Sequence, residues 1–507
     1  MAAFVVAGLL LRLRGIHNPL LDHPGWRQGD TAAIARNFAT LQYNIFFPQA
    51  DYNGPPPNYV ELELQIVPFL AATLYKMFGV HEIFGRLLSV AFGLGTIVVT
   101  GAFARWLFRS ALAGLAAAAI YAALPGGIYY SRTFMPDTAM VFFFTAAIYA
   151  CARFFWDEDA SSWRGLFPAA LLLMLAFLAK PVAVVAIVPV AASALARYGW
   201  RKTLMRPQTY VLLAVAFVPL AAYGSFVNAH AEWHWASGIT QKHVLPALRQ
   251  AFTSVHAFRS KLSATGIVLQ MLVRTMLGPF GFAFLVAGFA LPFRQRERAL
   301  LYAWLGAALV YIYIVVTVER VDYYMYLILP LAALVGGNLV QRFWLAARAN
   351  KGWQVAVAAA ALLYVAMVSI DRRLIAPYYA YSKTNYALAR ALDATLAPNA
   401  LIVMGHYDPS ILYYINRKGW EEDPYLWTPF DEQSAIRKGA RYFVAVEHQR
   451  LEHNVELYAW LARFPVDETK RWPVYETDYA KMLPGAEARW QAFRRAEKAG
   501  LLPPHLH

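Results

Sequence analysis

Residues 17–38 read HNPLLDHPGWRQGDTAAIARNF, and they follow the first apolar segment of the chain. The charged side chains that matter here are two acids and two arginines: Asp22, Asp30, Arg27 and Arg36. From Gly29 onward the composition favours a helix, and Asp30 stands where an N-cap residue is expected. A short helix at a membrane surface with these charges could hold an anionic lipid head group and accept a proton. The alternative is a solvated helix whose charges only mark the interface.

The composition is that of a polytopic membrane protein. Of 507 residues, 59% are hydrophobic and 15% are charged, whereas a soluble domain has about 25% charged residues. The net charge of +15 comes from Lys and Arg clusters between apolar segments. Such clusters orient membrane proteins, so the charge does not indicate nucleic-acid binding. The single cysteine, Cys151, excludes a disulfide within the chain and a cysteine metal site.

Apolar runs long enough to enter or cross a bilayer extend through the first 370 residues. They are 2–13, 64–78, 83–104, 111–128, 138–155, 166–179, 182–195, 210–226, 266–293, 299–318, 324–343 and 355–370. Five basic clusters lie between them: Arg105/Arg109, Arg153/Arg164, Arg197/Arg201/Lys202/Arg206, Arg294/Arg296/Arg298 and Arg342/Arg348/Lys351.

These clusters decide the topology. If run 64–78 crosses the bilayer, the first cluster lies on the opposite side from the other four. If that run is half-embedded at the outer surface, all five lie inside, which is the simpler solution. We therefore expect about 11 spans, with the N-terminus inside and the C-terminal tail outside.

The chain divides into a membrane domain, residues 1–370 with its first outer loop at 14–63, and a soluble outer domain, residues 371–507. In the second, residues 400–404 and 442–446 are typical of buried strands, and 383–396 and 431–438 of helices. The predicted fold is thus an α-helical polytopic membrane protein with a small C-terminal α/β domain outside the membrane. The sequence contains no nucleotide-binding glycine fingerprint or P-loop.

This topology places the loops with unusual polar residues on the outer face. They are 17–63, 129–137, 180–181, 228–263 and 319–323. Charged groups at the edge of hydrocarbon are costly and by default indicate a functional site. In the first loop Asp30 is the candidate base, and Arg27 and Arg36 are candidate phosphate ligands, because guanidinium pairs bidentately with phosphate. Arg36 lies on a different helix face from Asp30, so it could equally be a packing anchor.

The later outer loops offer the same kind of choice. Asp137 either supports the chemistry, together with Arg132, or serves only as a favourable acid in the first turn of a helix. Lys180 either extends to lipid phosphate or binds a substrate phosphate, and we favour the substrate. For Arg320 both interpretations stay open.

The loop before run 64–78 adds the alternating acids Glu61 and Glu63. With Asp30 and Asp137 they could hold a divalent cation through oxygen ligands. No spacing demands a metal, so the sequence assigns no metal ligand and no certain cofactor.

At these residues the chain resembles the GT-C glycosyltransferases. The group includes the protein O-mannosyltransferases (glycosyltransferase family 39) and the bacterial aminoarabinose transferases of lipid A. The matching stretches are WRQGDTAAIARNF (26–38), ELQIVPFLAATLYKMFGVHEIFGRLLS (63–89), YYSRTFMPD (129–137), LAKP (178–181) and LYYINRKGW (412–420). The resemblance spans most of the first 200 residues and one point in the tail.

The resemblance implies a polyprenyl- or dolichyl-phosphate-linked sugar as donor and a protein, lipid or glycan as acceptor. The acceptor attacks the anomeric carbon with inversion, on the outer face of a membrane that is expected to be the bacterial plasma membrane. Carried over by position, Asp30 is the base and Asp137 the supporting acid. Glu63 corresponds to the acid ahead of the half-embedded segment. The leaving phosphate would be stabilised by Arg27, Arg132 or Lys180.

One departure from the family pattern concerns the base. With Ile34-Ala35-Arg36 in register, Arg27 occupies the usual position of the aspartate, and Asp30 is displaced by about one helical turn. If the helix does not present Asp30 to the site, Asp22 or Glu63 takes the role.

Two other functions use a similar outer surface. A transporter or flippase of polyprenyl-linked sugars would be expected to show internal repeats and broken helices, and the sequence shows no repeat. A glycan ligase or polymerase acting on a polyprenyl pyrophosphate would need more cations.

Overall fold

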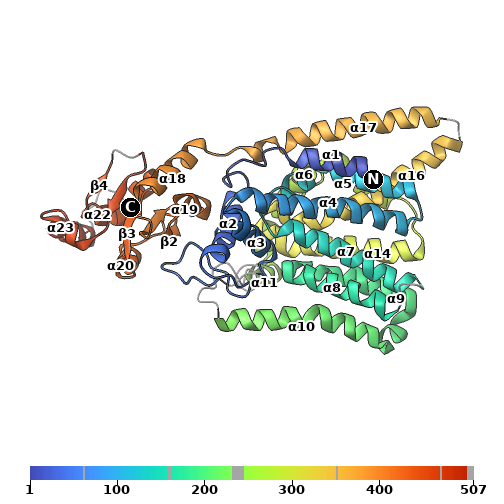
Figure 1. Cartoon of the computed structure of the whole chain (residues 1–507), viewed down its shortest axis with the longest axis horizontal. Coiled ribbons are helices and arrows are strands. Elements are labelled where there is room, and N and C mark those ends of the chain that lie inside the picture. The colour runs from blue at the N-terminus through green and yellow to red at the C-terminus, as the bar shows by residue number, and fades with distance from the viewer. Residues whose placement is uncertain (61–62, 158–161, 231–244, 350–351, 469–470, 500–507) are drawn as a thin grey trace.

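The computed structural model describes residues 1–60, 63–157, 162–230, 245–349, 352–468 and 471–499. A bundle of long helices leads at one end into a small α/β domain built from the C-terminal residues (Figure 1). The helices α2 and α3 lie at that end of the bundle, between its long helices and the C-terminal domain (Figure 1). Of the sequence-predicted residues, Glu61 and Lys351, and the part of the outer loop at 231–244, lie outside the described ranges.

The α-helices of the bundle run from α1 to α17. They are α1 (Ala2–Arg12), α2 (Gly25–Thr40), α3 (Ile66–Phe78), α4 (Glu82–Leu107), α5 (Ala111–Ala123), α6 (Pro125–Tyr130), α7 (Asp137–Trp156), α8 (Trp163–Ala179), α9 (Ile187–Met205), α10 (Pro207–His230), α11 (Leu245–Thr253), α12 (Val255–Met271), α13 (Gly278–Phe289), α14 (Gln295–Tyr311), α15 (Thr317–Glu319), α16 (Leu329–Ala349) and α17 (Trp353–Leu374). Short 3₁₀ or π segments join several of them: η1 (Pro181–Ala186), η3 (Leu272–Met276), η4 (Ile312–Val316), η5 (Asp322–Ile328) and η6 (Ala376–Tyr379).

Seven helical stretches among the described residues are long and apolar enough to cross a membrane, or eight if one bent pair counts as a single span. Four shorter apolar helices, α1, α3, α5 and α8, accompany them. The count of about 11 spans therefore stays a prediction. The helix ends that carry the five basic clusters gather at the end of the bundle away from the C-terminal domain (Figure 1).

Two of the apolar runs do not form single continuous helices. Run 111–128 is interrupted at Leu124, and run 266–293 bends by 109° where α13 begins. In each case a proline, Pro125 or Pro279, lies in the first turn of the new helix, where its missing N–H costs nothing. Gly278, before Pro279, has φ +67°, a conformation that glycine adopts without strain.

The prediction that Asp30 is an N-cap residue is also wrong. Helix α2 begins at Gly25, and Asp30 lies within it. Pro24 occupies the cap position, and its carbonyl accepts hydrogen bonds from the amides of Arg27 and Gln28. Proline has no backbone N–H that could donate a hydrogen bond to a preceding helical turn. It is therefore tolerated at the start of a helix, and α2 begins directly after Pro24. As a result Arg27 and Asp30 lie three residues apart on one helix face.

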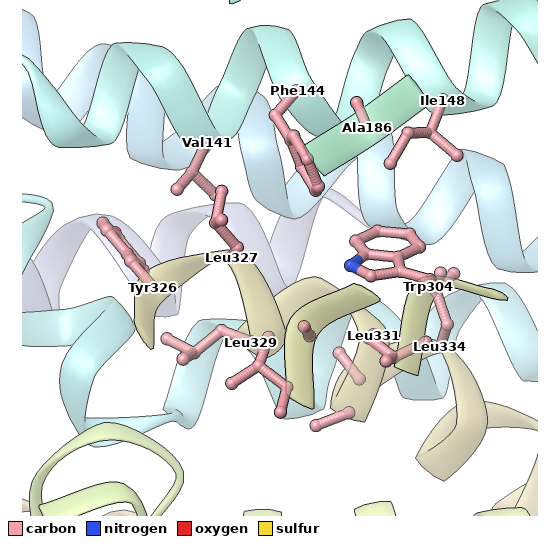
Figure 2. Packing of buried hydrophobic residues seen from close by; sticks show 14 of the residues in the cluster. Val141, Phe144, Ile148, Ala186, Trp304, Tyr326, Leu327, Leu329, Leu331 and Leu334 are labelled. Atoms are coloured by element: carbon pink, nitrogen blue, oxygen red, sulfur yellow. The ribbon is translucent and has the colours of Figure 1, made fainter. Parts of the chain in front are cut away.

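Helices α7, α14 and α16 enclose the core of the bundle. The indole of Trp304, on α14, is fully buried and packs edge-on against Phe144 of α7, with 5.4 Å between ring centroids. Leu331 and Leu334, on α16, lie on the other side of this layer (Figure 2). The core is closely packed and apolar, so it fixes these helices relative to one another.

The C-terminal domain contains a five-stranded mixed sheet. Its strands are β1 (Leu401–Gly405), β2 (Lys418–Glu422), β3 (Ala440–Val444), β4 (Val466–Asp467) and β5 (Val474–Glu476), in the order β2-β1-β3-β5-β4. Strand β1 is parallel to β2 and β3, whereas β5 is antiparallel to β3 and β4. The helices are α18 (Lys383–Thr395), α19 (Pro409–Ile415), α20 (Pro429–Arg437), α21 (His448–His453), α22 (Val455–Leu461) and α23 (Ala486–Lys498), with the 3₁₀ turn η7 (Tyr479–Lys481). The predicted strands at 400–404 and 442–446 correspond to β1 and β3, and the predicted helices to α18 and α20.

Helix α19 of this domain packs directly on α2. Gly29 lies against Ser410, and a Cβ built on Gly29 would be 2.4 Å from the Ser410 Cα. Elsewhere in the contact, the Tyr414 hydroxyl accepts a bond from the amide of Leu20 and donates one to Glu82. The C-terminal domain is thus seated on the helix that carries Arg27 and Asp30.

The close contact at Gly29 gives a direct test of this seating. The Gly29→Ala variant should lower Tm by several degrees and speed proteolysis between α17 and α18, because an added methyl group in a tight contact costs about 1–3 kcal/mol. Gly306→Ala is the matched control, since a Cβ at that helical position meets nothing within 4 Å. Equal Tm and proteolysis rates for the two variants would contradict the packing.

Candidate functional site

A buried carboxylate holds the first outer loop in place. Asp22 is paired with Arg86 of α4, 3.0 Å away, and with Arg132 of the second outer loop. All three side chains are fully buried. The Gln28 amide donates a further bond of 2.8 Å to Asp22. With all these partners and no exposure, Asp22 is not available to take a proton from an acceptor.

Arg27 pairs with two acids beside this anchor. Its guanidinium lies 3.2 Å from Asp30 and also contacts Glu63, the last residue of the first outer loop. The Tyr52 hydroxyl donates a hydrogen bond of 3.1 Å to the second oxygen of Asp30. Arg27 occupies the position where the family usually has its aspartate, and Asp30 is the acid displaced from it. The two therefore lie on the same face of α2.

The environment of Asp30 changes its protonation. Burial raises the pKa of the Asp30 carboxyl from 3.8 to about 6, while the charge of Arg27 and the bond from Tyr52 offset part of the rise. A carboxylate with this pKa is ionised at neutral pH and is a better proton acceptor than an exposed aspartate.

A second ion pair, Lys180 with Asp137, lies where α8 ends and α7 begins. Lys180, directly after α8, places its Nζ 2.6 Å from Asp137, the first residue of α7. The ammonium also lies over the rings of Tyr323 and Tyr324, at 5.2 and 4.7 Å from their centroids. The other carboxylate oxygen of Asp137 is buried without a hydrogen-bond partner among the described residues. Lys180 is thus a cation held in a fixed position at the end of α8.

The ion pairs of Arg27 lie beside the pair of Lys180 with Asp137. The amide of Leu64, next to Glu63, donates a bond of 3.1 Å to the carbonyl of Leu178, two residues before Lys180. Although burial works against it, the pKa of Arg27 is raised by Glu63 and Asp30, and Asp137 adds to the rise. The structure therefore brings together Arg27, Asp30, Glu63, Asp137 and Lys180.

The other three predicted residues lie apart from this group. Arg132 pairs with Asp22 and donates 2.8 Å to the Gly15 carbonyl. Arg36 contacts Asp51 and stacks on the ring of Tyr413, 4.4 Å from its centroid.

Arg36 therefore joins α2 to the C-terminal domain, which agrees with the interpretation of a packing anchor. Arg320 is exposed, after α15, in a left-handed conformation with φ +52°.

Sequence reasoning missed the tyrosines of the site. Tyr52 lies in a loop with no motif, and only the fold brings it to Asp30. Tyr323 and Tyr324 follow Asp322 in the segment VERVDYY, where the charged Arg320 was the candidate and no pattern distinguished the tyrosines. Asp322 itself accepts bonds from Tyr130, Tyr378 and Thr275, and so ties the second outer loop to the segment after α17.

No three His, Cys, Asp or Glu side chains among the described residues are grouped closely enough to hold a metal ion. Of the four acids predicted as possible cation ligands, Asp30, Glu61, Glu63 and Asp137, Glu61 lies outside the described ranges. A cavity of about 830 Å³ lies on the Arg36 side of α2 and is lined by residues of α2, α18 and α19, with none of the five grouped residues.

Comparison with known proteins places this arrangement in a fold family. Residues 65–225 match the family model described as dolichyl-phosphate-mannose-protein mannosyltransferase. The crystal structure of ArnT from Cupriavidus metallidurans bound to undecaprenyl phosphate superposes with a TM-score of 0.60 at 16% identity, over 95% of this chain and 99% of that chain. The chain has the GT-C fold. The apo structure of the same ArnT gives a TM-score of 0.54, also at 16% identity, over 91% and 90% of the two chains.

A comparison with curated proteins gave no match. The GT-C fold and the apolar helices together establish an integral membrane protein with a fold shared by membrane glycosyltransferases.

Of the contacts that hold the first outer loop, the ion pairs of Asp22 should contribute most to the stability of the fold. Asp22→Ala leaves two buried guanidinium groups without their carboxylate, which typically costs about 3–5 kcal/mol. We expect a large loss of Tm and of folded yield in detergent. Glu476→Ala, which removes the partner of the exposed Lys481, should change Tm little, because surface ion pairs contribute little to stability. Similar losses in both variants would show that the Asp22 pairs do not hold the loop.

Proposed function

We propose that the chain is an inverting membrane glycosyltransferase that moves a sugar from a polyprenyl-phosphate donor to an acceptor at the end of the bundle that carries the C-terminal domain. The observation that carries the proposal is a buried acid of raised pKa, Asp30, held by Arg27, in the same group of residues as the fixed cation Lys180 in a GT-C fold. The solved ArnT structure holds undecaprenyl phosphate, which supports the donor class.

In the proposed reaction the acceptor hydroxyl attacks the anomeric carbon and gives its proton to the Asp30 carboxylate. The bond between that carbon and the lipid phosphate oxygen breaks, and the lipid phosphate leaves as a monoester. The Tyr52 hydroxyl and Arg27 hold Asp30 in one orientation, so the base is positioned before the acceptor arrives.

Lys180 neutralises the charge that develops on the leaving phosphate. Asp137 and the two tyrosine rings fix the ammonium group in the absence of donor. Arg27 is the second cation within reach, since its guanidinium is held between Asp30 and Glu63. Arg36 and Arg132 are left out of this role because they lie apart from this group, at Asp51 and Asp22 respectively.

We infer that the site faces the outside of a bacterial plasma membrane, where no nucleotide is available and a lipid-linked donor is used instead. The acceptor would approach between the bundle and the C-terminal domain. The broken helices at Leu124 and before α13 would also suit a transporter. The grouped residues, however, include a positioned base that transport does not need, and this favours the transferase.

Replacing the proposed base should abolish transfer. Asp30→Asn keeps the size and the hydrogen-bonding capacity of the side chain but cannot take the proton, and we expect a loss of about 10²–10⁴-fold in the transfer rate. The measurement is sugar transfer from a polyprenyl-phosphate donor by the purified protein. Glu452→Gln, an exposed substitution in the C-terminal domain, is the control. An Asp30→Asn variant with full activity would refute the assignment.

The same assignment predicts a pH profile. Because the pKa of Asp30 is about 6, its carboxyl is protonated below that pH and cannot act as a base. Transfer should therefore rise with pH through about pH 6 and then level off. A rate that is constant between pH 5 and pH 7 would contradict the role of Asp30.

Removing the fixed cation should weaken donor binding. Lys180→Met retains the chain length but not the charge, so we expect at least about tenfold weaker binding of a short-chain polyprenyl phosphate, given about 1.5–3 kcal/mol for a hydrogen bond to a charged group. Lys202→Met, an exposed lysine at the opposite end of the bundle, is the control. Unchanged affinity in a folded Lys180→Met protein would remove Lys180 from the site.

A further inference from the structure

A second polar cavity lies at the other end of the membrane helices. It has a volume of about 510 Å³ and lies among the end of α4, the end of α7 and the start of α14. Figure 1 shows that these helix ends are remote from α2 and from the C-terminal domain. The proposed transferase mechanism makes no use of this cavity.

Three arginines line the cavity. Arg105 lies in the last turn of α4, Arg109 follows that helix, and Arg296 lies in the first turn of α14. None of the ion pairs formed within the described ranges includes any of the three. Arg105 and Arg109 are exposed, whereas Arg296 is partly buried.

Arg296 is held rigidly. Its guanidinium donates bonds of 3.2 and 2.7 Å to the carbonyls of Trp106 and Leu107 at the end of α4. It also lies over the Trp106 ring, 4.7 Å from the centroid. A guanidinium fixed in this way loses little further freedom when it binds an anion.

Among the described residues one acid lines the cavity, and it does not neutralise this charge. Asp157 accepts bonds of 2.9 Å from the Trp106 indole N–H at both carboxylate oxygens. It is also paired with Arg153, 2.9 Å away. Since Arg153 already balances Asp157, the three lining arginines present an excess of positive charge to the cavity.

The surroundings indicate what would bind there. Helices α4 and α7, and the helical stretch Gln295–Glu319 that begins with α14, are long and apolar enough to span a membrane, so their ends lie at the level of lipid head groups. Tyr149 and Trp106 form an aromatic wall of the kind found at that level. The anion present there in quantity is the phosphate of an acidic phospholipid.

We propose that this cavity is a binding site for the head group of an anionic phospholipid in the leaflet opposite the C-terminal domain. Arg105, Arg109 and Arg296 bind the phosphate oxygens. Trp106 and Tyr149 pack against the glycerol region. The site is separate from the proposed donor site, and it differs from a general excess of basic residues because one arginine is fixed in advance within a cavity.

The test is lipid binding by the full-length protein in detergent, followed by native mass spectrometry with added cardiolipin, phosphatidylglycerol or phosphatidylcholine. We expect the two acidic lipids to bind and the zwitterionic lipid not to compete. The double variant R105A/R109A should weaken binding of the acidic lipids by about tenfold or more, given about 1 kcal/mol per basic residue. Both residues are exposed, so this variant should keep the Tm of the unmodified protein without lipid.

The control is R201A/K202A, which removes two exposed charges from α9 at the same end of the bundle and should leave lipid binding almost unchanged. Equal losses in the two double variants would overturn the proposal in favour of general surface attraction. Glycerol phosphate is added as a competitor at matched concentration. Competition as strong as that of the lipid would overturn the lipid assignment and indicate a site for soluble phosphate compounds.

Discussion

The pairing of Asp22 with Arg86 and Arg132 is the constraint on which the outer part of the structure depends. It joins the first outer loop to α4 and to the second outer loop through three fully buried side chains. One carboxylate faces two guanidinium groups, and the carbonyls of Gly15 and Pro19 supply further acceptors. Burying any of these polar or charged groups costs free energy unless the group is hydrogen-bonded or ion-paired. The contacts therefore hold the loop in one position.

Helix α2 begins shortly after Asp22, and two of its faces make different contacts. One face presents Arg27 and Asp30 to Glu63 and to the Lys180 region. Another face packs on α19 through Gly29 and binds the C-terminal domain through Arg36. A change in the seating of that domain would therefore shift the proposed base, which offers a physical route by which an acceptor bound near the C-terminal domain could affect the chemistry.

The sequence was sufficient for the class of fold and for most helices, because apolar runs and basic clusters follow directly from the demands of a bilayer. It was not sufficient for the start of α2, where Pro24 outweighed the capping preference of Asp30, or for the breaks before Pro125 and Pro279. Five of the eight predicted site residues lie together. Arg132 could not be separated from them by sequence, since a buried structural arginine and a phosphate ligand look alike until a partner such as Asp22 is known. Tyr52 could not be found at all, because its contact with Asp30 arises only from the path of the loop.

The most direct test of the account is an experimental structure with a short-chain polyprenyl phosphate bound. The account predicts that the phosphate lies within about 3 Å of the Lys180 Nζ, with Asp30 facing the position where an acceptor would attack. A phosphate bound away from Lys180, with Asp30 still enclosed between Arg27 and Tyr52 and remote from the ligand, would contradict it.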